Sequence, residues 1–220
     1  MRFSAVLFDF DGVLVDSEPV RFAAGASALA TVGIELTWEM FLRYWFGRTD
    51  RAGLGDILGT RFAEEGPAVV AHRNAIVAER LDEISLFPDA ERFIARVPSN
   101  IKIGIVTGSR RIEVDAILRR VLPGRSFASI TSAEDYTQPK PDPGPFLAGA
   151  RAVQSTPSAC LVLEDSPAGI IAAQRAGMRT VGVERGRFIP LPDATWRVAS
   201  LDELTVSPDG EIRVAAASQR

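Results

Sequence analysis

The chain has 220 residues, 46% of them hydrophobic and 24% charged, which is ordinary for a soluble globular enzyme built as one domain with an insertion or as two small domains. Its formal net charge of −3 excludes the basic surface of a protein that binds nucleic acid or an anionic membrane. A single cysteine excludes an internal disulfide, and one histidine with one cysteine leaves almost no material for a histidine-rich metal site or a Cys-His nucleophile pair.

The hydrophobicity pattern of the sequence also shows neither a membrane span nor an export signal. No window holds the roughly 18 apolar residues that a membrane span requires. Near the N-terminus, Asp9 and Asp11 interrupt the apolar run before the core of a signal peptide is complete. We therefore expect a cytoplasmic protein.

The first predicted element is a strand at 5–10, "AVLFDF", whose apolar run is typical of a strand buried on both faces. Residues 17–87 differ, because they contain amphipathic helical stretches and no convincing strand. These stretches are "PVRFAAGASALATVG", "TWEMFLRYWFG", "RAGLGDILGTRFAEEG" and "PAVVAHRNAIVAERLDE". The pattern predicts a helical domain at 17–87, inserted into an α/β core domain formed by 1–16 and 88–220.

After the insertion, apolar runs alternate with helical patterns, which predicts a doubly wound parallel sheet with right-handed crossovers. Ser166, Pro167 and Gly177 are suited to begin and end the last helix. In the tail, "PDG" between two short β-like runs predicts either a hairpin or a frayed end. The predicted strands are 101–107, 160–165 and 179–184, and the predicted helices are 110–121, 145–153 and 167–177.

Acids and hydroxyls follow the predicted strands, at the edge of the sheet where ligands bind in such folds. They are Asp9, Asp11, Thr107, Gly108, Ser109, Glu164 and Asp165. Four carboxylates in one crevice repel one another unless a cation neutralises them, and oxygen ligands favour Mg²⁺. Asp9, Asp165 and a backbone carbonyl near Asp11 are suited to hold that ion, which predicts a phosphorylated substrate.

Two further features favour phosphate. Lys140 lies among prolines in a chain with 23 arginines and two lysines, which favours a site that needs a compact charge; a solvated loop lysine is the alternative. Thr107 offers a hydroxyl, and backbone N–H groups near Gly108 at a helix start suit an anion. Each feature alone has an ordinary explanation as a turn, a helix cap or a dipole contact, and it is their order that favours a site.

The motifs "DFDGVLVDS", "VTGS", the lysine of "QPKPDP" and "LEDSPAGI" resemble, in order, the four signature motifs of the haloacid dehalogenase-like (HAD) hydrolase superfamily. The resemblance covers nearly all of residues 4–190, and it implies a Rossmann-like core. The helical insertion resembles the cap of the branch that holds sugar-phosphate phosphatases and β-phosphoglucomutase.

The resemblance implies a phosphoaspartyl mechanism with Mg²⁺. Asp9 is implied as the nucleophile and a metal ligand, and Asp11 as the general acid and base that also offers its backbone carbonyl to the metal. Thr107 and Lys140 are implied to hold the transferring phosphoryl group. Asp165 would bind Mg²⁺ directly and Glu164 through water. The phosphate-binding loop would include Gly108 and Ser109.

Asp11 and Asp165 together favour phosphoryl transfer over dehalogenation. A phosphatase that acts on a small phosphorylated metabolite is the main hypothesis, and a β-phosphoglucomutase-type mutase is the alternative. The position that aligns with the cap histidine of those mutases is Arg21, which favours hydrolysis. A non-catalytic binding protein is disfavoured because every motif residue is present.

Three cap arginines, Arg21, Arg43 and Arg48, are candidates to contact the leaving group. Arg48 is the one we predict as a ligand, because "FGR" falls where related caps place residues that face the substrate. An exposed arginine is more often merely solvated. A closed helical cap removes the need for a partner chain over the site, so we predict a monomer. No nucleic acid or membrane is expected as a partner.

Overall fold

The computed structural model describes residues 2–185 and 190–215, in a chain that forms two compact units. The first unit comprises Met1–Val15 and Leu86–Arg220, and the second comprises Asp16–Ser85. The short strands β2 (Val15–Asp16) and β3 (Ser85–Leu86), where the chain passes from one unit to the other, pair with each other. The predicted α/β core with a helical insertion is confirmed.

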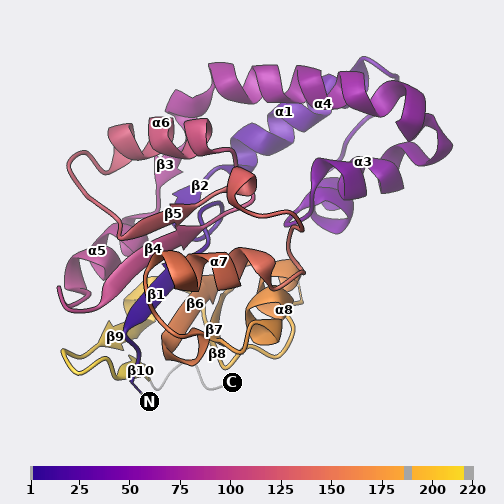
Figure 1. Ribbon diagram of the computed structural model, residues 1–220. Coiled ribbons are helices and arrows are strands. Elements are labelled where there is room, and N and C mark those ends of the chain that lie inside the picture. Colours follow the sequence, from indigo (N-terminus) through magenta and orange to yellow (C-terminus); the bar gives the residue numbers. More distant parts are fainter. Residues whose placement is uncertain (1, 186–189, 216–220) are drawn as a thin grey trace. The chain divides into compact units, whose positions relative to one another are not determined.

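A six-stranded sheet with the order β5-β4-β1-β6-β7-β8 forms the centre of the first unit (Figure 1). All its pairings are parallel. The four predicted strands are present and end one or two residues earlier, whereas β5 and β8 were not predicted because three residues are too few to show a period. The strands are β1 (Ala5–Phe8), β4 (Lys102–Val106), β5 (Ser129–Thr131), β6 (Cys160–Glu164), β7 (Arg179–Val183) and β8 (Trp196–Val198).

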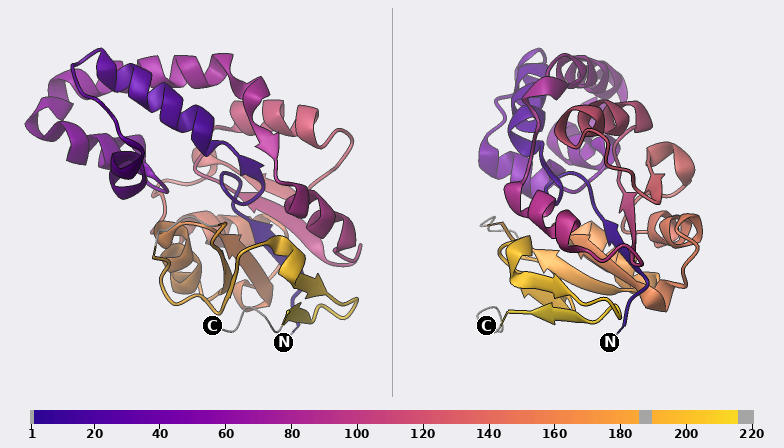
Figure 2. Two further views of the ribbon diagram at one scale, coloured as in Figure 1. Left: turned by 180° about the vertical axis from the view of Figure 1, so that it is seen from behind. Right: turned by 90° about the vertical axis from the view of Figure 1, so that its left-hand side faces the viewer.

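Helices cover both faces of this sheet. Successive residues of β1 point to opposite faces, and all four are buried, so each face of the strand is covered. Leu7 belongs to a buried cluster with residues of α7 and α8, whereas the Phe8 ring packs against Phe93 of α5, with 5.9 Å between the ring centroids. Figure 1 shows α7 and α8 in front of the sheet, and the reverse view in Figure 2 brings α5 forward. The helices are α5 (Pro88–Arg96), α6 (Arg111–Val121), α7 (Gly144–Ala152) and α8 (Pro167–Arg175). The strand order reverses direction at β1, which makes its carboxyl end a topological switch point.

The boundaries of α8 follow the sequence prediction. The Ser166 hydroxyl accepts a hydrogen bond from the Gly169 backbone N–H at 3.1 Å, and Pro167 occupies the first helical position. After the helix, Gly177 adopts a φ of +76°, a conformation that suits glycine, and the chain turns into β7. The start of α8 is therefore held directly beside the end of β6.

Ser166→Ala is expected to lower the free energy of unfolding by about 2 kcal/mol, because it removes the cap and a hydrogen bond to the Glu164 carboxylate. A urea titration measures this as a lower midpoint with an unchanged slope. The control is Ser158→Ala, at an exposed serine before β6, which is expected to change stability by less than about 0.5 kcal/mol. Equal destabilisation by the two variants would contradict the capping role.

The second unit is helical, as predicted, but its helices break at a different place. The prediction divided residues 51–83 at Pro67; this was wrong, because α3 ends at Leu58, just before Gly59 (φ +57°), and Pro67 lies inside α4. As the sixth residue of α4, this proline removes one hydrogen bond within the helix, and the helix continues through it. The helices are α1 (Glu18–Ala30), α2 (Trp38–Met40), the π-helix Phe41–Trp45, α3 (Asp50–Leu58) and α4 (Phe62–Glu79).

The tail forms a hairpin, which decides between the two predictions made for it. Strands β9 (Leu204–Val206) and β10 (Ile212–Val214) pair antiparallel, and Gly210 of "PDG" adopts a φ of +79° in the turn. Residues 216–220 lie outside the described part of the tail. Within residues 2–185 and 190–215, no helix is both long and apolar enough to span a bilayer.

Candidate active site

The predicted site residues gather at the carboxyl edge of the sheet. Phe8, the last residue of β1, is in register with the last residue but one of both β4 and β6. The Asp9 N–H then donates to the carbonyl of Leu163 at 2.9 Å, so these strands end level with one another. The residues brought to this edge are Asp9, Asp11, Thr107, Gly108, Ser109, Glu164 and Asp165.

Lys140, from the loop before α7, lies among these acids. Its ammonium group donates to the carboxylate of Asp9, to Oε1 of Glu164 at 2.8 Å and to the carbonyl of Val106 at 3.1 Å. It also lies 4.7 Å from the centre of the Phe146 ring. All three N–H donors of the lysine are used, so it must share or release one to hold a phosphoryl oxygen. The alternative of a solvated loop lysine is excluded by these contacts.

Burial and the charge of the partner shift the pKa values of this ion pair in opposite directions. The side chains of Lys140 and Asp9 are each 10% exposed. Burial raises the pKa of Asp9 well above its ordinary range, and Glu164 and Asp11 add to this, whereas Lys140 opposes it. Burial by itself would lower the pKa of Lys140, but the Asp9 and Glu164 charges raise it. The lysine therefore stays charged.

Both carboxylate oxygens of Glu164 have protein partners. Oε1 accepts from Lys140, and Oε2 accepts from the Ser166 N–H at 2.7 Å and from the Ser166 hydroxyl at 2.9 Å. Gly169 leaves the room for this carboxylate, because a Cβ there would lie 1.8 Å from Oε1. Glu164 thus joins the lysine to the start of α8. Sequence reasoning missed these contacts of Ser166 and Gly169, which no motif spacing reveals.

Asp11 is held separately from Asp9. Its Oδ2 accepts a hydrogen bond from the Ser109 hydroxyl at 2.5 Å. The Thr107 hydroxyl accepts from the Ser109 N–H at 3.0 Å, which closes the turn after β4. Helix α6 begins at Arg111, so the predicted helix start lies just beyond this turn. The two acids of the first motif therefore have different partners.

Comparison with known proteins identifies the family. The model of the haloacid dehalogenase-like hydrolase family matches residues 6–183. The chain belongs to this family. Among curated HAD relatives, β-phosphoglucomutase of Bacillus subtilis is 30% identical over 92% of this chain and 92% of its own. Hexitol phosphatase A of Escherichia coli is 28% identical over 96% of this chain and 99% of its own.

A solved HAD structure agrees with these relatives. The crystal structure of β-phosphoglucomutase from Clostridium difficile has a TM-score of 0.79 and 27% identity, and covers 91% of this chain and 92% of that one. The chain spans only 18% of the length of another relative, the chloroplastic protein Suppressor of quenching 1 of Arabidopsis thaliana, which is 32% identical over 83% of this chain. The family match and relatives such as hexitol phosphatase A show that this chain is an enzyme, a HAD-like phosphatase.

The donor set fits the Mg²⁺ ion that this HAD-like chain is predicted to bind. Asp9 and Asp165 are both buried, and they lie at one edge with Asp11 and Glu164. Four carboxylates and one ammonium group leave an excess of negative charge, which favours a hard divalent cation. In residues 2–185 and 190–215, no three His, Cys, Asp or Glu side chains are grouped so that they could hold a metal ion by themselves. An ion here would thus also use a backbone carbonyl and oxygens of water or substrate.

Tyr136 is a site residue that sequence reasoning missed. Its hydroxyl donates to the carbonyl of Thr107 at 2.9 Å, and it is the nearest group, at 3.9 Å, to a Cβ built on Gly108. Burial raises the pKa of Tyr136, so the hydroxyl stays protonated and acts as a donor. The tyrosine supports the phosphate-binding turn predicted at Thr107 and Gly108. No strand end or motif carries it, so the sequence offered no signal for it.

Arg48 is engaged within the helical unit. Its guanidinium donates to the Tyr44 carbonyl at 3.0 Å and to the carboxylate of Asp56 at 2.8 Å, and its side chain is 36% exposed. The Arg21 guanidinium donates to the Ser17 hydroxyl at 3.2 Å. Contact between Arg48 and a leaving group stays a prediction.

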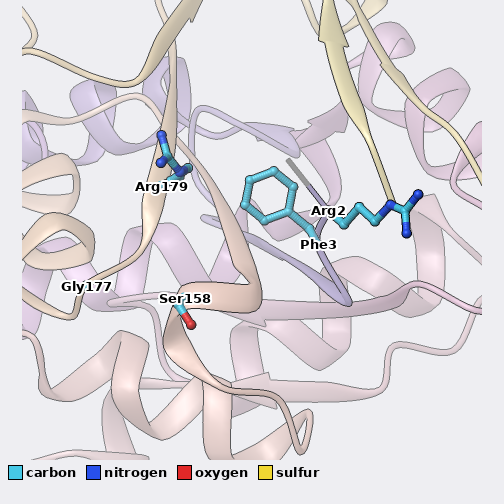
Figure 3. Close-up of a pocket in the computed structure, with 5 residues that line it drawn as sticks. All are labelled: Arg2, Phe3, Ser158, Gly177 and Arg179. Carbon is cyan, nitrogen blue, oxygen red and sulfur yellow. The ribbon is translucent and has the colours of Figure 1, made fainter. Parts of the chain in front are cut away.

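A pocket of about 410 Å³ lies at the opposite, amino edge of the sheet (Figure 3). In Figure 3 the Arg2 guanidinium and the Ser158 hydroxyl point away from the Phe3 ring between them. Arg2 forms an ion pair with Asp209 at 3.2 Å. The polar groups diverge, and ligands bind at the carboxyl edge in this fold, so the pocket is not the candidate site. It is lined by Arg2, Phe3, Ser158, Gly177 and Arg179.

Proposed function

We propose that this HAD-like chain is a Mg²⁺-dependent phosphomonoesterase that hydrolyses a small phosphorylated metabolite, a sugar phosphate or a similar compound, through an aspartyl-phosphate. The observation that carries the proposal is the separate support of two neighbouring acids. Asp9 is bonded to a buried lysine, whereas Asp11 is bonded to the Ser109 hydroxyl. Phosphoryl transfer through a covalent intermediate needs one acid as nucleophile and another as proton carrier.

In the first step, a carboxylate oxygen of Asp9 attacks phosphorus while the bond to the leaving oxygen breaks. Asp11 gives its proton to that oxygen, so the alcohol leaves neutral. In the second step, water attacks the phosphorus of the aspartyl-phosphate, and the ionised Asp11 takes its proton. Inorganic phosphate leaves and Asp9 is regenerated. Lys140 and the Thr107 hydroxyl hold the transferring oxygens.

Asp9, Asp165 and the backbone carbonyl of Asp11 are the groups that would hold Mg²⁺. Glu164 would act through a water, using the acceptor position on Oε1 that Lys140 leaves. The bound ion would offset the charge of the substrate phosphate and of the carboxylates around it.

A hexose phosphate mutase is the alternative, because curated relatives include both a β-phosphoglucomutase and a hexitol phosphatase. One residue favours hydrolysis: position 21, which aligns with a cap histidine of the mutases, is arginine. Arginine does not titrate near neutral pH, so it cannot take part in proton transfer as histidine does.

Purified protein is expected to release inorganic phosphate from at least one compound in a panel of sugar phosphates. EDTA should stop the release and excess Mg²⁺ should restore it. Conversion of a hexose 1-phosphate to the 6-phosphate without free phosphate would instead establish the mutase. No phosphate release from any compound, with or without Mg²⁺, would contradict both the reaction class and the metal.

A further inference from the structure

Arg185, just beyond β7, is bonded to two separate parts of the α/β unit. Its Nε donates to the Gly12 carbonyl at 3.1 Å, and its Nη2 donates to the Val13 carbonyl at 2.7 Å. Its Nη1 donates to both carboxylate oxygens of Asp89, each at 2.8 Å. The side chains of Arg185 and Asp89 are only 8% and 7% exposed. A charged pair this deeply buried is retained only where its hydrogen bonds are satisfied.

Asp89 is itself held firmly at the start of α5. Its Oδ2 accepts from the Ser200 hydroxyl and from the Leu201 N–H, both at 2.8 Å. Burial would raise the pKa of Asp89, but these hydrogen bonds and the Arg185 charge lower it, so the carboxylate is ionised. The Arg185 guanidinium also lies 3.7 Å from the centre of the Phe87 ring. The Arg185 guanidinium is therefore held by Asp89 and Phe87 as well as by the loop of the first motif.

The loop that Arg185 holds begins at Asp11. The Leu14 and Val15 N–H groups both donate to the Phe10 carbonyl at 3.0 Å, and Gly12, with a φ of +81°, donates to Val15 at 2.8 Å. Three N–H groups of the loop are therefore used internally, and the Gly12 and Val13 carbonyls accept from the guanidinium. Without Arg185, two carbonyls in a buried segment would lose these donors.

The backbone of Arg185 is strained. Its φ is +45°, a conformation that residues other than glycine rarely adopt. Such strain persists where surrounding contacts enforce it, and it is found preferentially at functional sites. Here the surrounding contacts include the two hydrogen bonds to the loop of the first motif.

We propose that Arg185 is a positioning residue for Asp11: it fixes the loop 11–15 so that the Asp11 carboxylate meets the leaving oxygen. The inference rests on the proposed phosphatase function. Ser109 bonds the side chain of Asp11, and Arg185 bonds the backbone carbonyl of the residue that follows it. Misplacement of a catalytic group by about 1 Å can cost 10²-fold in rate.

The test compares two leaving groups of similar size. Benzyl phosphate releases a strongly basic alkoxide that needs a proton, whereas 4-nitrophenyl phosphate releases a weakly basic phenolate that does not. In a two-step mechanism, kcat/KM reports the step in which the leaving group departs. Arg185→Lys keeps the charge, but an ammonium group has three donors at one point and so cannot make all four hydrogen bonds to the Gly12 and Val13 carbonyls and to both carboxylate oxygens of Asp89. It is expected to lower kcat/KM about 10²-fold for benzyl phosphate and less than about threefold for 4-nitrophenyl phosphate.

Arg197→Lys is the matched control. Arg197 donates to the carbonyls of Leu191 and Pro192, at 2.7 Å and 3.2 Å, and contacts Glu184 at 3.5 Å, so it has the same kind of partners without touching the first motif. This variant is expected to change kcat/KM equally, and little, for the two substrates. Asp89→Asn, which loosens the anchor, should reproduce the selective loss in weaker form.

An equal loss for both substrates in Arg185→Lys would overturn the inference and leave the phosphatase function standing. So would a selective loss in Arg197→Lys. Failure of both Arg185→Lys and Asp89→Asn to fold, judged by thermal unfolding, would also overturn it, because the pair would then serve the fold alone. Inactivity of the wild-type protein on both substrates would count against the proposed function itself.

Discussion

Asp9→Asn is expected to abolish phosphate release, by at least about 10³-fold in kcat, because the amide cannot form the covalent intermediate. The variant should stay folded, since asparagine has the same shape as aspartate and introduces no buried charge. Lys140 also retains Glu164 and the Val106 carbonyl as partners. Phosphate release by the purified variant, measured beside its thermal unfolding, checks both expectations.

The matched control is Asp209→Asn, in the turn between β9 and β10. Its side chain is 52% exposed and lies far along the chain from every motif, so its activity should equal that of the wild type. Wild-type activity in Asp9→Asn would contradict the phosphoaspartyl mechanism, because an amide at this position cannot form the covalent intermediate.

Lys140→Met is expected to impair activity and stability together. It leaves Asp9 and Glu164 buried without their cation, which typically costs about 3 kcal/mol or more in the free energy of unfolding. Loss of the charge that holds the phosphoryl group should lower kcat by at least about 10²-fold. Urea unfolding and phosphate release in Mg²⁺ measure the two effects.

Lys102→Met, at the only other lysine of the chain, is the control. Lys102 donates to the Val153 and Gln154 carbonyls, at 2.7 Å and 3.4 Å, and within the described part of the chain its hydrogen bonds reach no residue of the site. Its loss should cost about 1 kcal/mol in stability and leave kcat unchanged. If the two variants lost the same stability and neither lost activity, Lys140 would be an ordinary structural lysine.

The fold class was predictable because long apolar strands and amphipathic helices carry strong local signals. Strands β1, β4, β6 and β7 and the ends of α8 show this, since each is several residues long or is bounded by a cap or a glycine. Strands β5 and β8 were missed because each has three residues and takes its stability from its neighbour in the sheet. The break at Gly59 was missed because proline is the stronger local signal, and only packing decides whether a helix continues through it.

The candidate site divides in the same way. Asp9, Asp11, Thr107, Glu164 and Asp165 could be found because each follows a predicted strand and the strands of a parallel sheet end at one edge. The sequence by itself thus determined the fold class, the family and the acids of the site. Only the tertiary structure decided that Lys140 bonds both Asp9 and Glu164, that Tyr136 supports the turn after β4, and that Arg185 reaches the first motif. The physical reason is that these contacts join residues far apart in the chain, from loops whose course depends on the packing of the whole unit and not on any local period.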